Sequence, residues 1–217
     1  MHTEPTPRRG RPRIITRETI ADAGRRLTLP HVTLEGVARE LGVGVRSLYK
    51  HTDGIGDIQA ITAEAILAAW EAPSPTGELE DHLLEVAVSL RDLALANPGI
   101  AGFLVRASED VSPGVVRTID AHQQSVARAY GLLPAQASLL LGTVAEHALA
   151  VTDVISAQGG RHRDIERMKG RTDLAALSAA ARTTGLADPE QHFRFTARAL
   201  IRGLLELTAD MTGQQER

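Results

Sequence analysis

Residues 33–52 constrain the fold of this chain more than any other stretch, because they read as two short helices joined by a glycine turn. Thr33 can cap the first helix, since its hydroxyl can accept an otherwise unpaired backbone N–H of the opening turn. The apolar residues of that helix recur at helical spacing: Leu34, Val37, Ala38 and Leu41. Gly42 and Gly44 supply the backbone freedom for a tight reversal. The pattern predicts a helix-turn-helix.

The second of these helices, expected over residues 45–51, has one large apolar anchor, Leu48. At about 100° per residue, Arg46 and Lys50 lie on the face opposite Leu48, and Ser47 and Tyr49 flank them. A short helix that points cations and hydrogen-bonding groups away from its core is suited to the major groove of DNA. This face predicts that the protein binds DNA.

A cluster of arginines stands just upstream, at Arg8, Arg9, Arg11 and Arg13. Pro5, Pro7 and Pro12 disfavour helix there, so residues 1–15 are expected to form an extended, flexible basic arm. Such an arm can enter a narrow, electronegative minor groove. The alternative is a basic tail that adds only non-specific attraction to phosphates.

Composition and charge narrow the class of protein further. Residues 1–51 carry ten Lys and Arg against five Asp and Glu, which leaves fourteen against twenty-two in the remainder. A basic front half on an acidic body directs nucleic acid to the front. Cysteine is absent, which excludes disulfides and thiolate zinc sites. The N-terminus has no signal-like apolar region, and we expect no apolar run long enough to span a bilayer, so the sequence predicts a cytoplasmic protein.

The rest of the chain predicts an all-α protein, since no segment shows the alternation typical of strands. The first helix is expected from Thr16, and the body reads as an antiparallel helical bundle. Its expected helices cover residues 57–70, 78–97, 100–106, 113–130, 134–158, 173–183 and 189–211. The domain limits are then 1–15 for the arm, 16–56 for the helix-turn-helix domain, and 57–217 for a domain of ligand binding and dimerisation. Residues 161–170 are highly charged and read as a mobile linker.

The N-terminal domain is expected to bury a small core shared by three helices. Its predicted members are Ile20, Leu27, Val37, Leu41, Val43 and Leu48. No catalytic motif accompanies it: the chain has no Gly-Xaa-Ser-Xaa-Gly elbow, no phosphate-binding loop and no paired helical histidines with zinc spacing. We therefore expect no enzyme activity, no cofactor and no metal.

At residues 16–58 the sequence resembles the tetracycline-repressor (TetR) family of bacterial transcriptional regulators. The residues that carry the resemblance are Thr33, Leu34, Val37, Ala38, Gly42, Val43, Ser47, Leu48, Tyr49 and His51. The resemblance implies a dimer in which a small molecule binds the C-terminal bundle and lowers the affinity for an operator. By position, Val45, Arg46, Ser47 and Lys50 look like base-facing residues, and Tyr49 and His51 look like phosphate contacts.

Three positions depart from the family pattern. Gly44 stands where a Ser or Thr cap is usual, although glycine is tolerated there. Thr52 replaces a common aromatic or valine. Ile55 replaces a lysine that usually contacts phosphate, so only the N-terminal N–H groups of the next helix could serve there.

Two helices of the body, residues 134–158 and 189–211, are the expected dimer faces. Their apolar residues exceed what one small core needs: Leu139, Leu140, Val144, Ala148, Val151, Leu200, Ile201, Leu204, Leu205 and Leu207. The alternative is that all of them fill the core of the monomer. Two-fold DNA half-sites require a two-fold protein, which favours the interface.

Residues for a small-molecule site are harder to select. Scarce aromatics and isolated polar groups in apolar helices are typical of ligand cavities. The selected residues are Trp70, Phe103, Arg106, His122, Val126, Thr143 and His147. Each could instead be a core or surface residue.

These features predict a homodimeric repressor that a small-molecule effector releases from a palindromic operator. Two alternatives remain. One is an architectural DNA-binding protein that uses its arginine arm and does not respond to ligands. The other is a helical small-molecule-binding protein or enzyme with a vestigial DNA-binding domain.

Overall fold

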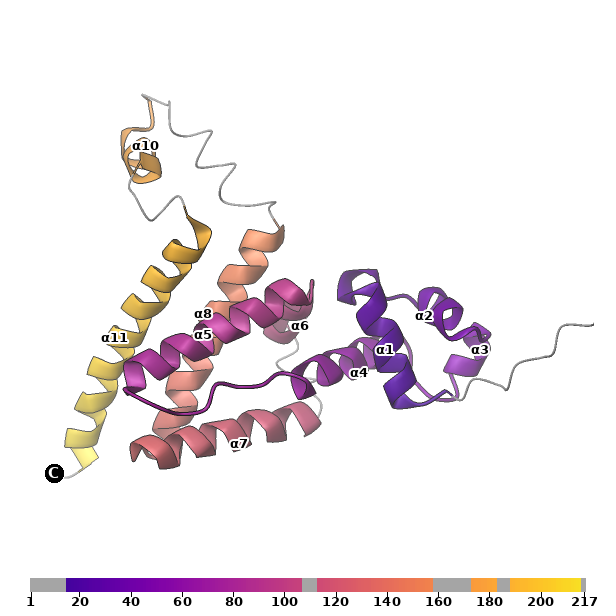
Figure 1. The fold of residues 1–217 in the computed structure, drawn as a ribbon, viewed down its shortest axis with the longest axis horizontal. Helices are drawn as coiled ribbons and strands as arrows, with labels where there is room; N and C mark the ends of the chain where they lie inside the picture. Colours follow the sequence, from indigo (N-terminus) through magenta and orange to yellow (C-terminus); the bar gives the residue numbers. More distant parts are fainter. Residues whose placement is uncertain (1–14, 107–112, 158–172, 183–187, 216–217) are drawn as a thin grey trace, which may run out of the picture. The chain divides into compact units, whose positions relative to one another are not determined.

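The computed structural model describes residues 15–106, 113–157, 173–182 and 188–215, and within these ranges every regular element is a helix (Figure 1). The elements are α1 (Arg17–Leu27), a short 3-10 turn η1 (Leu29–His31), α2 (Leu34–Leu41), α3 (Val45–Leu48), α4 (Ile55–Ala68), α5 (Leu79–Ala96), α6 (Ile100–Arg106), α7 (Pro113–Tyr130), α8 (Pro134–Ala157), α10 (Ala175–Arg182) and α11 (Pro189–Gln215). The predicted all-α fold is confirmed. The arginine arm and residues 161–170 lie outside the described residues.

Packing divides the chain into two compact units, Met1–Ala65 and Ile66–Arg217. The division falls inside α4, so it marks a change of packing partners along one continuous helix. The domain limits of 16–56 and 57–217 stay a prediction.

The first unit is built around one apolar cluster. Thr16 caps α1 in a reciprocal pair with Thr19, in which each side chain accepts the other's backbone N–H at 3.2 and 2.9 Å. Four of the predicted core residues are buried, namely Ile20, Val37, Leu41 and Leu48, while Leu27 and Val43 pack at its edge. Ile58 and Ile61 of α4 complete the cluster. The first part of α4 therefore contributes to this core, which the sequence analysis did not include among its members.

Gly24 allows α1 and α4 to approach closely within this unit. A Cβ added at Gly24 would lie 2.0 Å from Oγ1 of Thr62 and 2.9 Å from its Cγ2. Thr62 is fully buried, and its hydroxyl donates to the Ile58 carbonyl at 2.8 Å, which fixes the side chain. The contact leaves no room for a methyl group at position 24.

The second unit is organised around α8, which packs against α5, α6, α7 and α11 (Figure 1). Leu140, Val144 and Ala148 of α8 are buried in its core, together with Ile201 of α11. The monomer itself thus buries these four residues of the predicted dimer face. Leu139 and Leu207, in contrast, are exposed.

The apolar character of α8 has a further consequence. Residues Pro134–Val154 are long and apolar enough to cross a membrane by length and composition alone, which the sequence analysis did not expect. In the structure α8 packs against α5, α6, α7 and α11, so its apolar side chains contribute to a protein core.

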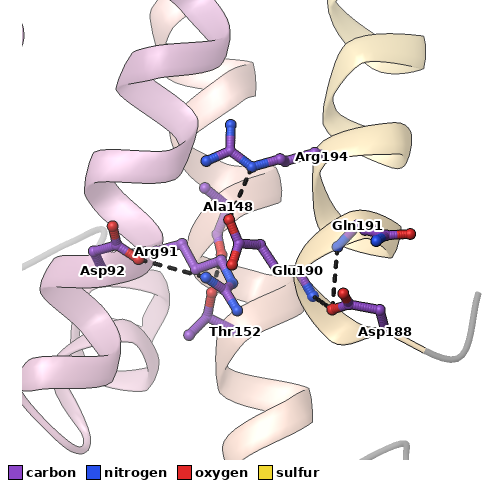
Figure 2. Close-up of polar contacts among 8 residues, drawn as sticks. All are labelled: Arg91, Asp92, Ala148, Thr152, Asp188, Glu190, Gln191 and Arg194. Atoms are coloured by element: carbon purple, nitrogen blue, oxygen red, sulfur yellow. Dashed lines mark hydrogen bonds and ion pairs between the residues drawn. The ribbon is translucent and has the colours of Figure 1, made fainter. Parts of the chain in front are cut away.

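The start of α11 is fixed by a local cap beside the core (Figure 2). Figure 2 shows the Asp188 carboxylate accepting the backbone N–H groups of Glu190 at 2.9 Å and Gln191 at 3.4 Å. Pro189 follows the cap at the first helical position, where a missing N–H costs nothing. Arg91 of α5 stacks over the buried ring of Phe193, 5.4 Å from its centroid.

The Gly24 contact generates a stability prediction. We expect Gly24→Ala to lower the free energy of unfolding by about 1–2 kcal/mol, because the clash outweighs the gain in helix propensity. Gly56→Ala is the matched control, since a Cβ there meets no atom within 4 Å. It should raise stability by up to about 1 kcal/mol. Urea unfolding followed by circular dichroism measures both, and equal effects of the two variants would contradict the packing argument.

Candidate nucleic-acid interface and ligand cavity

The turn between α2 and α3 is held by backbone and side-chain bonds that the sequence anticipates. The Thr33 hydroxyl accepts the Gly36 N–H at 3.0 Å and caps α2. Gly42 adopts a left-handed conformation with φ 66°, and the N–H of Val43 reaches back to the Ala38 carbonyl at 2.9 Å. These bonds satisfy the last carbonyls of α2 and redirect the chain into α3.

The recognition segment, residues 45–51, was expected to be helical throughout, but its regular helix is shorter. Gly44 precedes α3 without a side-chain cap, and α3 ends at Leu48 instead of His51. The N–H groups of Lys50 and His51 bond three residues back, to Ser47 and Leu48. The Leu48 carbonyl also accepts the N–H of Thr52 at 3.0 Å and its hydroxyl at 3.4 Å, so residues 49–52 form a tightened turn.

Burial gives this segment two distinct sides. Leu48 is fully buried and anchors it, whereas Arg46, Tyr49, Lys50 and His51 are exposed. Val45 and Ser47 are half-buried. The predicted DNA-binding residues of this segment are thus exposed or half-buried around a buried anchor; Thr33 and Gly44 are also exposed.

The cations of the first unit differ in whether they are neutralised within the protein. Arg17, Arg25 and Arg26 pair with Glu64, Asp22 and Glu40 at 3.1, 2.5 and 2.8 Å. In contrast, no ion pair involves Arg46, Lys50 or the exposed Arg39 among the residues that the structure describes. The sequence analysis did not select Arg39. Because Arg39 is exposed on α2 and has no ion pair among the described residues, it joins Arg46 and Lys50 as an unpaired cation of the first unit.

The start of α4 is less favourable for binding a phosphate than the sequence suggested, because a carboxylate already lies there. The N–H of Asp53 already donates to the Asp57 carboxylate at 3.2 Å, which places an acidic group in the first turn. Ile55 is 39% exposed beside it. Negative charge at this helix start disfavours a second anion.

The second unit contains a cavity of about 570 Å³, within the range of small-molecule sites. Leu67 and Trp70 line it from the end of α4 and the segment after it, and aliphatic side chains of α5 and α6 contribute further. The walls from α7 and α8 come from residues at helical spacing, among them Thr118 and His122 on α7 and Gly142 and Glu146 on α8. The indole N–H of Trp70 donates to the Ser89 hydroxyl at 2.9 Å, which fixes its ring.

The predicted ligand residues fall in different environments. Trp70 and His122 line the cavity, whereas Phe103 and Thr143 are half-buried elsewhere and Val126 lies in the core. His147 stacks on the buried Phe193 ring, with centroids 6.3 Å apart. The Arg106 side chain lies outside the described residues. Their roles in ligand binding stay a prediction.

Among the cavity residues that the sequence analysis did not assign to the site are Thr118, Gln123 and Gly142. A signal was available for Thr118, since it lies four residues, about one helical turn, before His122 on α7. A mid-helix glycine at position 142 was a second signal.

Buried imidazoles lie next to this cavity. His82 of α5 is fully buried, and neither ring nitrogen has a hydrogen-bond partner among the described residues. Its ring lies 6.2 Å from that of His122 and 5.6 Å from that of Tyr130. Burial lowers the pKa of His82, and the nearby Glu85 carboxylate opposes this shift. The pKa of His122 is lowered mainly by burial and further by the neighbouring His82. Both rings are therefore held in the neutral form.

These shifts predict acid sensitivity of the second unit. The unfolded chain takes up protons as the pH falls through the ordinary histidine pKa of about 6.5, before the folded protein does. Stability is therefore lost below that pH, by at most about 1.4 kcal/mol per pH unit for each histidine. Fluorescence of Trp70, the one tryptophan, follows unfolding of this unit. His82→Phe should show a shallower loss between pH 6.5 and 5, and an unchanged slope would contradict the argument.

Comparison with known proteins supports the fold. No family model matches the chain, and no curated protein matches it either. Among solved structures, apo ActR from Streptomyces coelicolor has a TM-score of 0.71 at 20% identity, over 89% of this chain and 98% of that one. ActR in complex with actinorhodin gives 0.67 at 21% identity, over 88% and 95%. TetR from Acinetobacter baumannii gives 0.61 at 20% identity, over 89% and 98%. The chain therefore has the fold of the TetR-family transcriptional regulators.

Proposed function

We propose that this protein is a DNA-binding transcriptional regulator, a cytoplasmic homodimeric repressor that a small molecule releases from a palindromic operator. The observation that carries the proposal is the exposure of Arg46 and Lys50 around the buried Leu48; within the described ranges neither cation has an ion-pair partner. The shared fold with TetR-family regulators supports it. The protein is not proposed to be an enzyme.

In this proposal the recognition segment enters the major groove, and the two segments of a dimer bind half-sites about 34–36 Å apart. Val45, Arg46, Ser47 and Lys50 face the bases, since Arg and Lys pair with guanine edges. Tyr49, His51 and the N-terminal N–H groups around Thr33 and Gly44 contact phosphates, which position the protein without reading sequence. Arg39 is a further phosphate contact. The arginine arm adds contacts in the minor groove.

A substitution pair separates base reading from phosphate binding. The DNA would be a duplex enriched by the wild-type protein from a random library, with a scrambled duplex beside it. Arg46→Ala should reduce the preference for the enriched duplex about fivefold or more, because a lost bidentate base contact costs about 1–3 kcal/mol. Tyr49→Phe should weaken binding to both duplexes alike. Fluorescence anisotropy at several salt concentrations measures both effects.

Arg128→Ala on α7 is the control, since Arg128 is exposed and lies in the second unit. Unchanged selectivity of Arg46→Ala would show that the base-facing assignment is wrong. Loss of all binding after deletion of residues 1–13 would favour the architectural protein. Failure to bind any duplex at low salt would overturn the proposed function in favour of the helical ligand-binding protein.

Exposed apolar residues on α8 and α11 support the proposed dimer. Phe195 and Leu207 of α11 are 70% and 66% exposed, and Leu139 and Val154 of α8 are about half exposed. Single exposed apolar residues are normal, and α7 also exposes Val116 and Ile119, so the choice of α8 and α11 rests further on the two-fold symmetry that two-fold half-sites require. Phe195, which the sequence analysis did not select, is the most exposed large apolar side chain among those described on α11.

The dimer prediction rests on these α11 side chains. We expect Leu207→Glu and Phe195→Glu each to raise the dimer dissociation constant at least tenfold, because a charge would be buried without a partner. Val116→Glu on α7 is the control, since Val116 is 53% exposed and lies on another helix. Sedimentation equilibrium measures the constants. Equal effects of all three substitutions would place the interface elsewhere.

The cavity supports the ligand-responsive part of the proposal. ActR is described in complex with actinorhodin, and a TetR variant from Acinetobacter baumannii in complex with minocycline. For this chain we propose a small-molecule effector of its own in the 570 Å³ cavity. Such an effector releases DNA only to the extent that it binds the DNA-free conformation more tightly.

A further inference from the structure

The cavity is kept open at one point by a glycine inside α8. Gly142 lies well inside this helix and lines the cavity. A Cβ added there would meet no atom within 4 Å, so close packing does not require the glycine. Glycine in a helix interior costs about 1 kcal/mol relative to alanine. Gly142 therefore makes α8 less stable than alanine would, at a position where a side chain would occupy open space in the cavity.

The charges around the cavity are unfavourable to an anion. Among the described residues that line it, Glu146 is the one acidic residue and none is a lysine or an arginine. His122 supplies no positive charge in its neutral form. An anionic ligand would lose its hydration without gaining a counter-charge, which is costly in an apolar site.

The hydrogen-bonding groups of the cavity lie mainly on α7. Thr118, His122 and Gln123 line it from this helix. The Nε2 atom of His122 is buried and has no partner among the described residues. Buried polar atoms are usually paired, so a ligand group that bonds to this nitrogen would remove a cost of the empty protein. Trp70 offers its ring instead, since its N–H is taken by Ser89.

From this combination we infer that the cavity selects uncharged, mainly apolar compounds with a hydrogen-bonding group for His122, and that Gly142 is a specificity-determining residue that sets the room for them. The inference rests on the proposed function in that the bound compound is the effector. It adds the chemical class of that effector and a residue that limits its size.

Two dyes with the same aromatic skeleton test the charge selection. N-phenyl-1-naphthylamine is uncharged, and 8-anilino-1-naphthalenesulfonate carries one added sulfonate. Both can receive excitation energy from Trp70, the single tryptophan and a cavity residue. We expect the uncharged dye to bind at least tenfold more tightly, with energy transfer from Trp70. Equal or tighter binding of the sulfonate would overturn the inference.

Substitutions at Gly142 test the site itself in the full-length protein. Gly142→Leu should weaken the uncharged dye at least tenfold, while Gly142→Ala, which keeps most of the room, should change binding less than threefold. Ala129→Leu is the control, since Ala129 is exposed on α7 and does not line the cavity. Circular dichroism checks that each variant folds. If Gly142→Leu folds and binds the dye as the wild type does, the inference is wrong.

The dye titrations test the inferred cavity chemistry and the DNA titrations test the proposed function, so each claim can be contradicted separately. A protein that binds its enriched duplex but shows no preference between the dyes remains a regulator and contradicts the inferred cavity chemistry. A protein that prefers the uncharged dye through Gly142 but retains no duplex supports the cavity chemistry and contradicts the proposed function.

Discussion

The burial of α8 by four neighbouring helices is the constraint on which the second unit depends. One side of α8, with Leu140, Val144 and Ala148, fills the core between α5 and α11. The side with Gly142 and Glu146 faces the cavity. With aromatic residues at only 3% of the chain, aliphatic side chains must fill the space between helices by close packing. At Gly142, which has no side chain, the neighbouring aliphatic side chains leave the space unfilled, and this space is part of the cavity.

In the first unit the corresponding constraint is the burial of Leu48. Its side chain fixes a segment that has only four residues in regular helix and no side-chain cap. A helix of this length has little stability of its own. Tertiary packing must therefore hold Arg46 and Lys50 in place, and among the described residues neither cation has an ion-pair partner, unlike the arginines of α1.

The sequence predicted those features that local chemistry decides. Thr33 caps a helix where its hydroxyl suggested, the first helix begins directly after Thr16, and prolines 113, 134 and 189 each begin one. Properties that depend on tertiary packing were predicted less well. An aliphatic stripe such as Leu140 and Ile201 does not show whether its partner lies in the same chain or in a second copy. The sequence selected His147 as a ligand residue without showing that its ring would stack on Phe193. Cavity walls form where helices diverge, which periodicity does not encode.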